Sequence, residues 1–229
     1  MEMSLSEALE DVAFSASGKR QHVYVTRHGG ALDAKDLHMQ HGDPQLSPTG
    51  EVAAAELAES LANAEPRPLH IVSSPFLRCV QTADAVAARL GLPILLEPGI
   101  CGVLQYFPPE LHLLDDLISY FPRIDASYTP VVAQLALEPD RSDGQAARRA
   151  ASTAITVRDR LSGPILFVGH SSSCLGMVEA FGGSGHVGCC TISHFSCAAQ
   201  GSSGSWQLEG VEGDASHLSS QYEAPSSMW

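Results

Sequence analysis

Four short runs of branched and aromatic apolar residues, separated by stretches with helical character, are the feature that most constrains the fold of this 229-residue chain. The runs are residues 23–25, 69–72, 94–96 and 165–168. Runs of this kind are typical of strands that are buried on both faces of a sheet. Strands that alternate with helices indicate a mostly parallel sheet covered by helices on both sides. The sequence therefore predicts an α/β fold.

Residues suited to helix ends mark two of the intervening helices. Ser47 is a suitable N-cap, and Pro48 suits the first turn of a helix that continues through residues 51–62. Gly91 follows a second helical stretch, residues 76–90, in the usual position of a C-terminal cap. The other expected elements are a helix over residues 143–161 and edge strands over residues 190–195 and 206–208.

Polar side chains follow three of the predicted strands, at the point where each strand ends. Arg27 and His28 close the first strand. Ser74 follows the second, with Arg78 in the first turn of the next helix, and His170 follows the fourth. The carboxyl ends of parallel strands lie on one edge of a sheet, where open α/β folds bind their ligands. We therefore expect two histidines and two arginines, distant in sequence, to converge there.

The residue types at this edge suit the binding and transfer of a phosphoryl group. A neutral imidazole is a good nucleophile near pH 7, so His28 is the candidate nucleophile. Arg27 and Arg78 can hold the phosphate oxygens, and a cation in the first turn of a helix favours a bound anion nearby. A protonated His170 would add a third cation, and the backbone N–H of Ser171 opens the following helix as an anion site. With three cations available, no metal or other cofactor is expected.

The charge balance argues against several classes of partner. Asp and Glu number 26 and Lys and Arg 13, which gives a formal net charge of −13. Nucleic acid and anionic membrane surfaces are therefore not expected as partners. We find neither an apolar stretch of the roughly 20 residues that a membrane span needs nor a signal peptide. The six cysteines form no CxxC pair and are interpreted as reduced, mostly buried thiols of a cytoplasmic protein.

The chain is expected to hold one domain, residues 21–210, preceded by a flexible lead-in over residues 1–20 and followed by a disordered tail over residues 211–229. The proline-containing stretch 99–141, with a helix near residues 111–120, is predicted to form an insert over the site. The insert is expected to set the substrate. The oligomeric state stays open, with a homodimer among the alternatives.

Residues 31–45 are expected to form a polar surface loop, and Asp43 belongs to it. The loop also holds His38 and His41. These two histidines lack further ligands at a suitable spacing, so no metal site is predicted.

Four motifs resemble those of the histidine phosphatase superfamily, whose fold is phosphoglycerate mutase-like, and they occur in the family's order. They are TRHG at 26–29, LSPTG at 46–50, SPFLRCVQTA at 74–83 and VGHSS at 168–172. Residues 97–100 and 124–128 are further similar to the phosphatase domain of the TULA proteins, suppressors of T-cell receptor signalling. The resemblance covers about residues 23–195.

This resemblance implies a three-layer α/β/α sandwich and a phosphomonoester hydrolase that acts through a phosphohistidine. By resemblance, His28 is the phosphorylated nucleophile, and the phosphate pocket is completed by Arg27, Arg78 and His170. The substrate would be a phosphorylated small molecule or a phosphoprotein.

Two positions depart from the pattern of the TULA-like group. Ala31 stands where the group carries an arginine, and Gly102 stands where it carries the acidic residue that protonates the leaving group. Candidates for a substitute proton donor are Glu97, Glu110, Asp33 and Asp115, among which the sequence does not choose. Without a strong general acid, a phenolate leaves more easily than an alkoxide. Activity is therefore expected to favour aryl phosphates such as phosphotyrosine.

Other interpretations stay open. The two departures also suit a pseudophosphatase that binds phosphorylated ligands without turnover, although the presence of both histidines opposes it. Another alternative is an α/β-hydrolase with Ser171 as nucleophile, but its motif needs glycine where Ser173 stands. A mutase is less favoured, because the insert shows no basic cluster. Residues 183–188 match GxGxxG but follow a helix, so they are interpreted as a loop.

Overall fold

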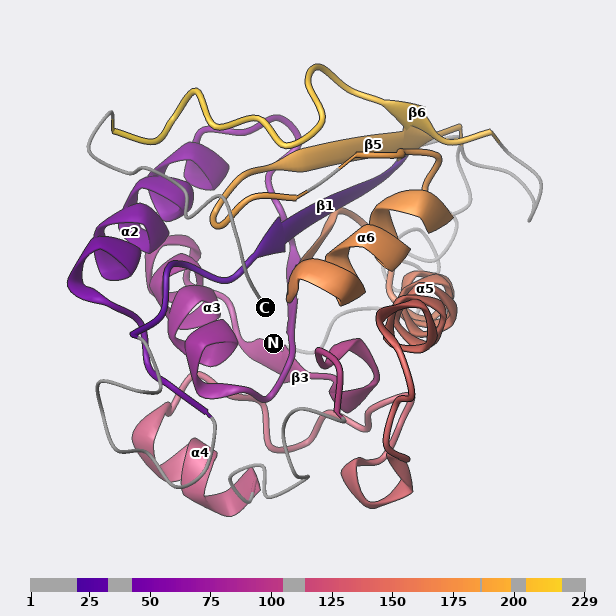
Figure 1. Ribbon diagram of the computed structural model, residues 1–229. Coiled ribbons are helices and arrows are strands. Elements are labelled where there is room, and N and C mark those ends of the chain that lie inside the picture. Colours follow the sequence, from indigo (N-terminus) through magenta and orange to yellow (C-terminus); the bar gives the residue numbers. More distant parts are fainter. Residues whose placement is uncertain (1–19, 33–42, 105–113, 186, 199–204, 220–229) are drawn as a thin grey trace, which may run out of the picture.

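The computed structural model describes residues 20–32, 43–104, 114–185, 187–198 and 205–219. A six-stranded sheet forms its centre (Figure 1). In order across the sheet, the strands are β3 (Ile94–Leu96), β2 (His70–Ser73), β4 (Ile165–Gly169), β1 (Gln21–Arg27), β5 (Ser193–Cys197) and β6 (Gln207–Leu208). The first four are parallel to their neighbours, whereas β5 is antiparallel to β1 and β6 to β5. The predicted, mostly parallel sheet is confirmed.

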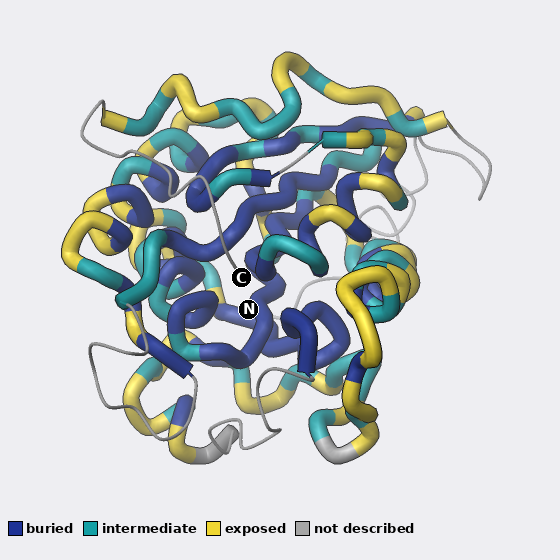
Figure 2. Tube along the Cα trace, viewed as in Figure 1, coloured by how far each residue is buried: buried dark blue, intermediate teal, exposed yellow. Residues whose placement is uncertain are grey.

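Helices cover both faces of this sheet. One face carries α2 (Pro48–Ala62) and α3 (Leu77–Leu90), and the other carries α5 (Asp143–Arg160) and α6 (Ser171–Ala180). Successive strand residues point to opposite faces, so Tyr24 and Leu166 pack toward α2 and α3, whereas Val25 and Phe167 pack toward α5 and α6. The buried backbone accordingly runs through the middle of the molecule (Figure 2). The fold is the predicted three-layer α/β/α sandwich.

The start of α2 lies against the loop that follows β1. The Ser47 side chain accepts a hydrogen bond from the Gly50 N–H at 3.1 Å, and Pro48 is the first helical residue, as predicted. The Ser47 N–H also donates to the Gly30 carbonyl at 2.8 Å. A Cβ atom at Gly50 would collide with that carbonyl oxygen. Glycine at this position therefore lets the helix approach the loop that carries His28.

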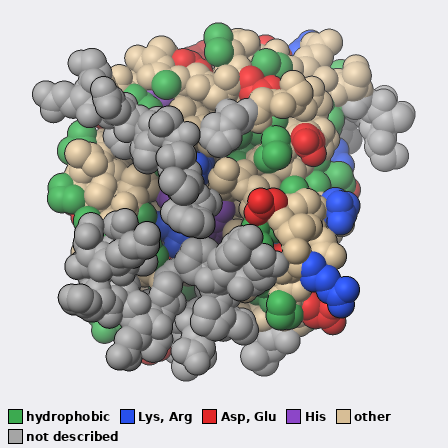
Figure 3. Space-filling view, in the orientation of Figure 1, with side chains coloured by type: hydrophobic (Ala, Val, Ile, Leu, Met, Phe, Trp, Pro, Cys, Tyr) green, Lys and Arg blue, Asp and Glu red, His purple; other side chains and the backbone are tan. Residues whose placement is uncertain are grey.

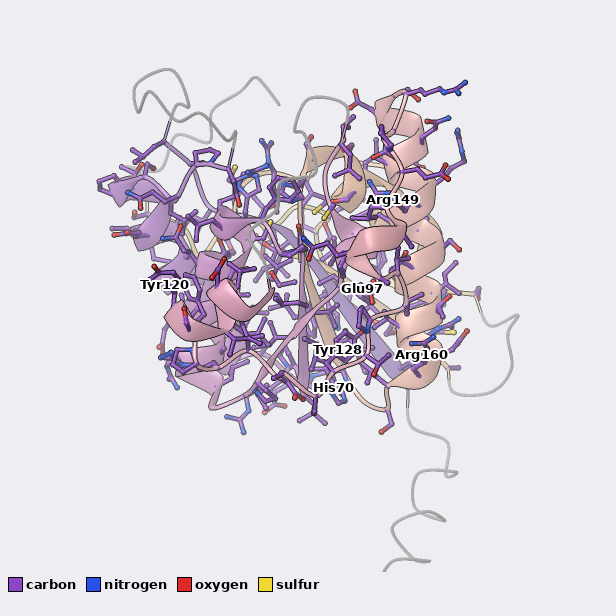
Figure 4. The ribbon with its side chains drawn as sticks, turned by 90° about the horizontal axis from the view of Figure 1, so that it is seen from below. His70, Glu97, Tyr120, Tyr128, Arg149 and Arg160 are labelled. Carbon is purple, nitrogen blue, oxygen red and sulfur yellow. The ribbon has the colours of Figure 1, made fainter. Side chains whose placement is uncertain are left out.

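The insert is anchored to the sheet by Glu97, directly after β3 (Figure 4). Its buried carboxylate accepts hydrogen bonds from the N–H groups of Val131 at 2.6 Å and Val132 at 3.1 Å and from the Tyr128 hydroxyl at 3.1 Å. The described elements of the insert are η1 (Pro98–Ile100), α4 (Leu114–Tyr120) and η2 (Gln134–Ala136). The helix expected near residues 111–120 is thus described from Leu114 onward.

Arg149 of α5 braces the segment that begins at η1. Its guanidinium donates to the carbonyls of Gly99 at 2.8 Å and Gly102 at 3.0 Å and to the Asp140 carboxylate at 2.6 Å. Asp140 in turn accepts from the Leu104 N–H at 3.2 Å. One guanidinium therefore fixes residues 99–104 against α5, whose Arg149 is labelled in Figure 4.

Residues 211–219, expected in a disordered tail, lie alongside β5. Asp214 and Ile192 exchange two backbone hydrogen bonds of 2.8 and 2.9 Å, and Leu218 packs against the core. Backbone pairing and apolar packing therefore hold this segment, which composition alone did not indicate. Residues 1–19 and 220–229 lie outside the described part of the chain. Among the described residues, no helix is both long enough and apolar enough to cross a membrane.

Candidate active site

The carboxyl ends of β1, β2 and β4 bring the candidate residues to one edge of the sheet. The ring centroids of His28 and His170 lie 5.3 Å apart, and the Ser74 hydroxyl oxygen lies 2.9 Å from Nε2 of His170. Both imidazoles and both guanidinium groups, those of Arg27 and Arg78, are almost entirely buried. Blue arginine or lysine and purple histidine atoms are visible at the centre of the face shown in Figure 3.

The guanidinium of Arg78 lies between the two imidazoles. Its Nε donates to Nε2 of His28 at 3.1 Å, and its Nη2 donates to Nδ1 of His170 at 3.0 Å. Because arginine has no acceptor atom, both ring nitrogens must carry lone pairs. The proton of His28 then lies on Nδ1, 2.7 Å from the Gly29 carbonyl, and that of His170 lies on Nε2, facing Ser74. Both rings are neutral.

The electrostatic surroundings agree with neutral rings. Burial lowers the pKa of His28 well below its usual value, and the charges of Arg78 and Arg27 lower it further. Burial likewise lowers the pKa of His170, followed by Arg78, by His28 and by Arg27. Burial and the two arginines disfavour a third positive charge on His170 by themselves, whereas its protonation beside a bound phosphate stays a prediction.

Asp43 is the residue of this site that sequence reasoning missed. It was expected in a polar surface loop, yet it is only 4% exposed. Both carboxylate oxygens accept from the Leu77 N–H at 3.0 Å, and Oδ1 also lies 3.4 Å from Nη1 of Arg78. Phe76, the N-cap residue of α3, offers no capping side chain. The unfavourable cation in the first turn was the signal that could have indicated such a carboxylate.

Ser171 is the first residue of α6, directly after His170. The N–H groups of a first turn have no intrahelical partner, so this end of α6 can accept an anion. Ser173 does not point there, because its hydroxyl accepts from the His170 N–H at 2.8 Å. Cys79 adds a thiol 3.3 Å from Nε2 of His170, and burial raises the pKa of that thiol well above its usual value.

The two positions that depart from the TULA-like pattern, Gly102 and Ala31, have different surroundings in the structure. A Cβ atom at Gly102 would be 3.1 Å from Cγ of His170, so this backbone packs directly against the ring. Ala31 forms an isolated bridge with Leu46. Glycine has no side chain and alanine only a methyl group, so neither position offers a charge or a transferable proton.

Of the four carboxylates considered as substitute proton donors, Glu97 is excluded by its contacts. Its two oxygens are occupied by backbone N–H groups and by the hydroxyl of Tyr128, which all serve to hold the insert. Asp33 and Glu110 lie outside the described residues, as does the side chain of Asp115.

The described residues hold no group of three or more metal-ligating side chains. The two histidines weighed for a metal site, His38 and His41, lie outside them. All six cysteines are free and buried, as predicted.

Comparison with known proteins places this geometry in a family. The family model "Histidine phosphatase superfamily (branch 1)" matches residues 23–185. Ubiquitin-associated and SH3 domain-containing protein A of Mus musculus is 31% identical over 142 residues, which cover 57% of this chain and 23% of that protein. This chain spans about a quarter of the length of the curated relatives of this kind.

Solved structures share the fold. Ecdysone phosphate phosphatase from Bombix mori, in complex with tungstate, is 18% identical with a TM-score of 0.62, covering 83% of this chain and 92% of that chain. Phosphoglycerate mutase from Bacillus anthracis str. Sterne is 16% identical with a TM-score of 0.59, covering 87% and 96%. The predicted likeness to TULA proteins and to the phosphoglycerate mutase-like fold is confirmed. The chain belongs to the histidine phosphatase superfamily.

Proposed function

We propose that this chain is a phosphomonoester hydrolase in which His28 accepts the phosphoryl group. The observation that carries the proposal is the buried, neutral His28, whose Nε2 lone pair faces Arg78 beside a second imidazole. A nucleophile must offer a lone pair near neutral pH, and the hydrogen bond from Nδ1 to the Gly29 carbonyl leaves Nε2 as that atom. Membership of the superfamily supports this reading.

The reaction divides into two displacements at phosphorus. In the first, the Arg78 N–H exchanges Nε2 of His28 for a phosphate oxygen, the freed Nε2 lone pair bonds to phosphorus, and the bond from phosphorus to the leaving oxygen breaks. Arg27, Arg78 and the backbone N–H of Ser171 offset the charge on the equatorial oxygens. In the second, a water oxygen bonds to phosphorus, the bond to Nε2 breaks and inorganic phosphate leaves. Two guanidinium groups supply the positive charge, so the proposal invokes no metal and activity should persist in a chelator.

The leaving group decides which substrates react well. The backbone at Gly102 packs against His170 and brings no carboxylate, and the contacts of Glu97 remove it as a donor. A leaving group that departs as a stable anion then has the advantage, which favours aryl phosphates such as phosphotyrosine. A rate series over substituted phenyl phosphates should depend steeply on the pKa of the phenol. A flat series, with chemistry rate-limiting, would contradict this substrate preference.

Turnover of para-nitrophenyl phosphate by wild type, His28→Ala and His70→Ala is the direct test. His70 lies at the start of β2 and contacts the Ser162 carbonyl, so it is a histidine control outside the site. We expect turnover in wild type and His70→Ala, loss of at least about a thousandfold in His28→Ala, and an acid-labile phosphoprotein in wild type. Turnover that survives His28→Ala would refute the proposal.

A pseudophosphatase is the second candidate, favoured by the missing charges at Ala31 and Gly102. It predicts that the wild type binds orthovanadate but neither turns over aryl phosphates nor forms a phosphoprotein. The α/β-hydrolase alternative is less favoured, because Nε2 of His170 donates to Ser74 and leaves Ser171 without that base. Labelling of Ser171 by a fluorophosphonate would favour it.

Free, buried thiols suit a reducing compartment such as the cytoplasm.

A further inference from the structure

Cys190 has an unusual backbone conformation close to the candidate site. Its φ of 55° lies in the left-handed region, which among the described non-glycine residues Cys190 alone adopts. Such a conformation is strained for a residue with a side chain and persists where the surroundings impose it. The Cys190 side chain is completely buried in the core beneath α2 and α3. This residue is therefore held in place by its neighbours on several sides.

Both backbone groups of Cys190 have partners from distant parts of the chain. Its N–H donates to the Arg27 carbonyl at 2.9 Å, and its carbonyl accepts from Nε2 of His217 at 2.9 Å. The left-handed turn directs these two groups to different partners. Two hydrogen bonds, one to each backbone group of Cys190, thus connect His217 to the end of β1, across 190 positions of sequence from Arg27.

The hydrogen bond from Cys190 to Arg27 lies at the end of β1, beyond the last residue pair that β1 forms with β5. On one side, Arg27 pairs with Gly169 of β4. On the other side, the pairing with β5 ends at Val25 and Ser193, and an isolated bridge from Arg27 to Cys189 takes its place. The stretch around Cys189 therefore continues the lateral support of β1 up to the residue that carries the guanidinium.

His217 is fixed independently of this contact. Asp214 pairs with Ile192, Leu218 packs against the core, and the Ser219 N–H donates to the Glu56 carboxylate at 3.0 Å. Nδ1 of His217 is buried without a hydrogen-bond partner in the described structure, so the ring is a single donor, directed from Nε2 to Cys190. This segment lies beyond the residues that the family model matches, which end at 185.

We propose that His217 is a positioning residue: through Cys190 it holds the strand end that carries Arg27 and thereby sets the affinity of the site for phosphate. The inference rests on the proposed function only in assigning Arg27 to phosphate. It predicts that a residue of the C-terminal segment controls anion binding without touching the anion.

The test compares His217→Ala with His217→Gln, whose amide nitrogen can take the place of Nε2. Ser219→Ala is the matched control, because it keeps the backbone N–H that contacts Glu56. The readout is the dissociation constant for orthovanadate, measured without turnover. We expect His217→Ala to weaken binding about fivefold, the effect of one lost hydrogen bond. His217→Gln should restore most of the loss, and Ser219→Ala should bind as the wild type does.

A double-mutant cycle shows whether the effect passes through Arg27. In an Arg27→Gln background, His217→Ala should weaken vanadate binding no further. An equal loss in both backgrounds, or no loss in either, would overturn the proposal.

Hydrogen exchange of the Cys190 amide separates this inference from the proposed function. The exchange should accelerate in His217→Ala and return toward the wild-type rate in His217→Gln, whether or not the protein turns over substrate. A wild type that binds no vanadate would overturn the assignment of phosphate to the site. Unchanged exchange in His217→Ala would overturn the support of the strand end by His217.

Discussion

At the scale of single residues, the site is defined by how Arg78 uses its nitrogens. One contacts His28, one contacts His170 and one contacts Asp43, so the guanidinium links residues from three separate segments. The positions of His28, Arg27, Arg78 and His170 could be predicted, because each follows a recognisable strand end or helix start. The protonation of His170 could not, since it depends on burial and on Arg78 rather than on residue type.

The neutral imidazoles predict the pH dependence of activity. The pKa of His28 is lowered by burial and by Arg78, so this proposed nucleophile stays unprotonated below pH 6.5. We expect kcat/KM for para-nitrophenyl phosphate, corrected for substrate ionisation, to stay level through pH 6.5 and to fall only at lower pH. An acid limb centred at or above pH 6.5 would contradict the lowered pKa.

The same shift has a consequence for stability. Below pH 6.5 the unfolded chain binds protons at His28 and His170 that the folded chain does not bind. The free energy of unfolding should therefore fall as the pH is lowered from 6.5. Urea titrations at each pH measure this free energy. They also show at which pH a loss of activity is caused by unfolding of the protein.

Asp43 predicts a second outcome at this scale. Asp43→Ala removes the acceptor of the Leu77 N–H and the carboxylate beside Arg78. Because both groups are left buried without it, we expect a loss of about 2 kcal/mol in the free energy of unfolding. Asp43→Asn should lose less, since its amide oxygen can still accept from Leu77. Urea unfolding of both variants measures these losses. Equal losses would mean that the hydrogen bond from the Leu77 N–H to residue 43 contributes nothing to stability.

At the scale of elements, hydrogen bonds hold short loop segments near the site against longer helices and strands. The strands were predicted from apolar runs and the helices α2 and α3 from capping residues, and Ser47, Pro48 and Gly91 lie at the predicted helix ends. The contacts between Arg149 and residues 99–104 could not be predicted, because most of the acceptors are backbone carbonyls, which every residue has. Residues 211–219 were missed for the same reason, since backbone pairing holds much of that segment.

Arg149→Lys tests this brace. An ammonium group cannot reproduce the planar set of donors that contacts Gly99, Gly102 and Asp140. We expect the free energy of unfolding to fall by about 2 kcal/mol, and kcat/KM to fall because Gly102 packs against His170. Arg148→Lys, at the exposed neighbouring position, should change stability by no more than about 0.5 kcal/mol. Equal behaviour of the two variants would show that the brace has no role.

At the scale of the whole molecule, the parallel strands decide where the site forms. Residues from positions 27, 74 and 170 meet because β1, β2 and β4 end at one edge. A chain with a net charge of −13 thereby gathers two buried arginines at a single place. The alternation of strands and helices was sufficient to predict this edge. The sequence did not choose among the four candidate proton donors, because their placement relative to the site depends on loop conformation rather than on residue type.

The position of Arg78 between two uncharged rings has a consequence for ligand entry. An incoming dianion should draw the guanidinium of Arg78 to itself, which would release Nδ1 of His170 and raise the pKa of that ring. Binding of the anion should therefore be coupled to the uptake of a proton from solvent by His170. Titration calorimetry with orthovanadate, in buffers of different ionisation enthalpy, should report net uptake near neutral pH, and a His170→Asn variant should abolish it. The imidazolium form of His170 would then be present only while the anion is bound.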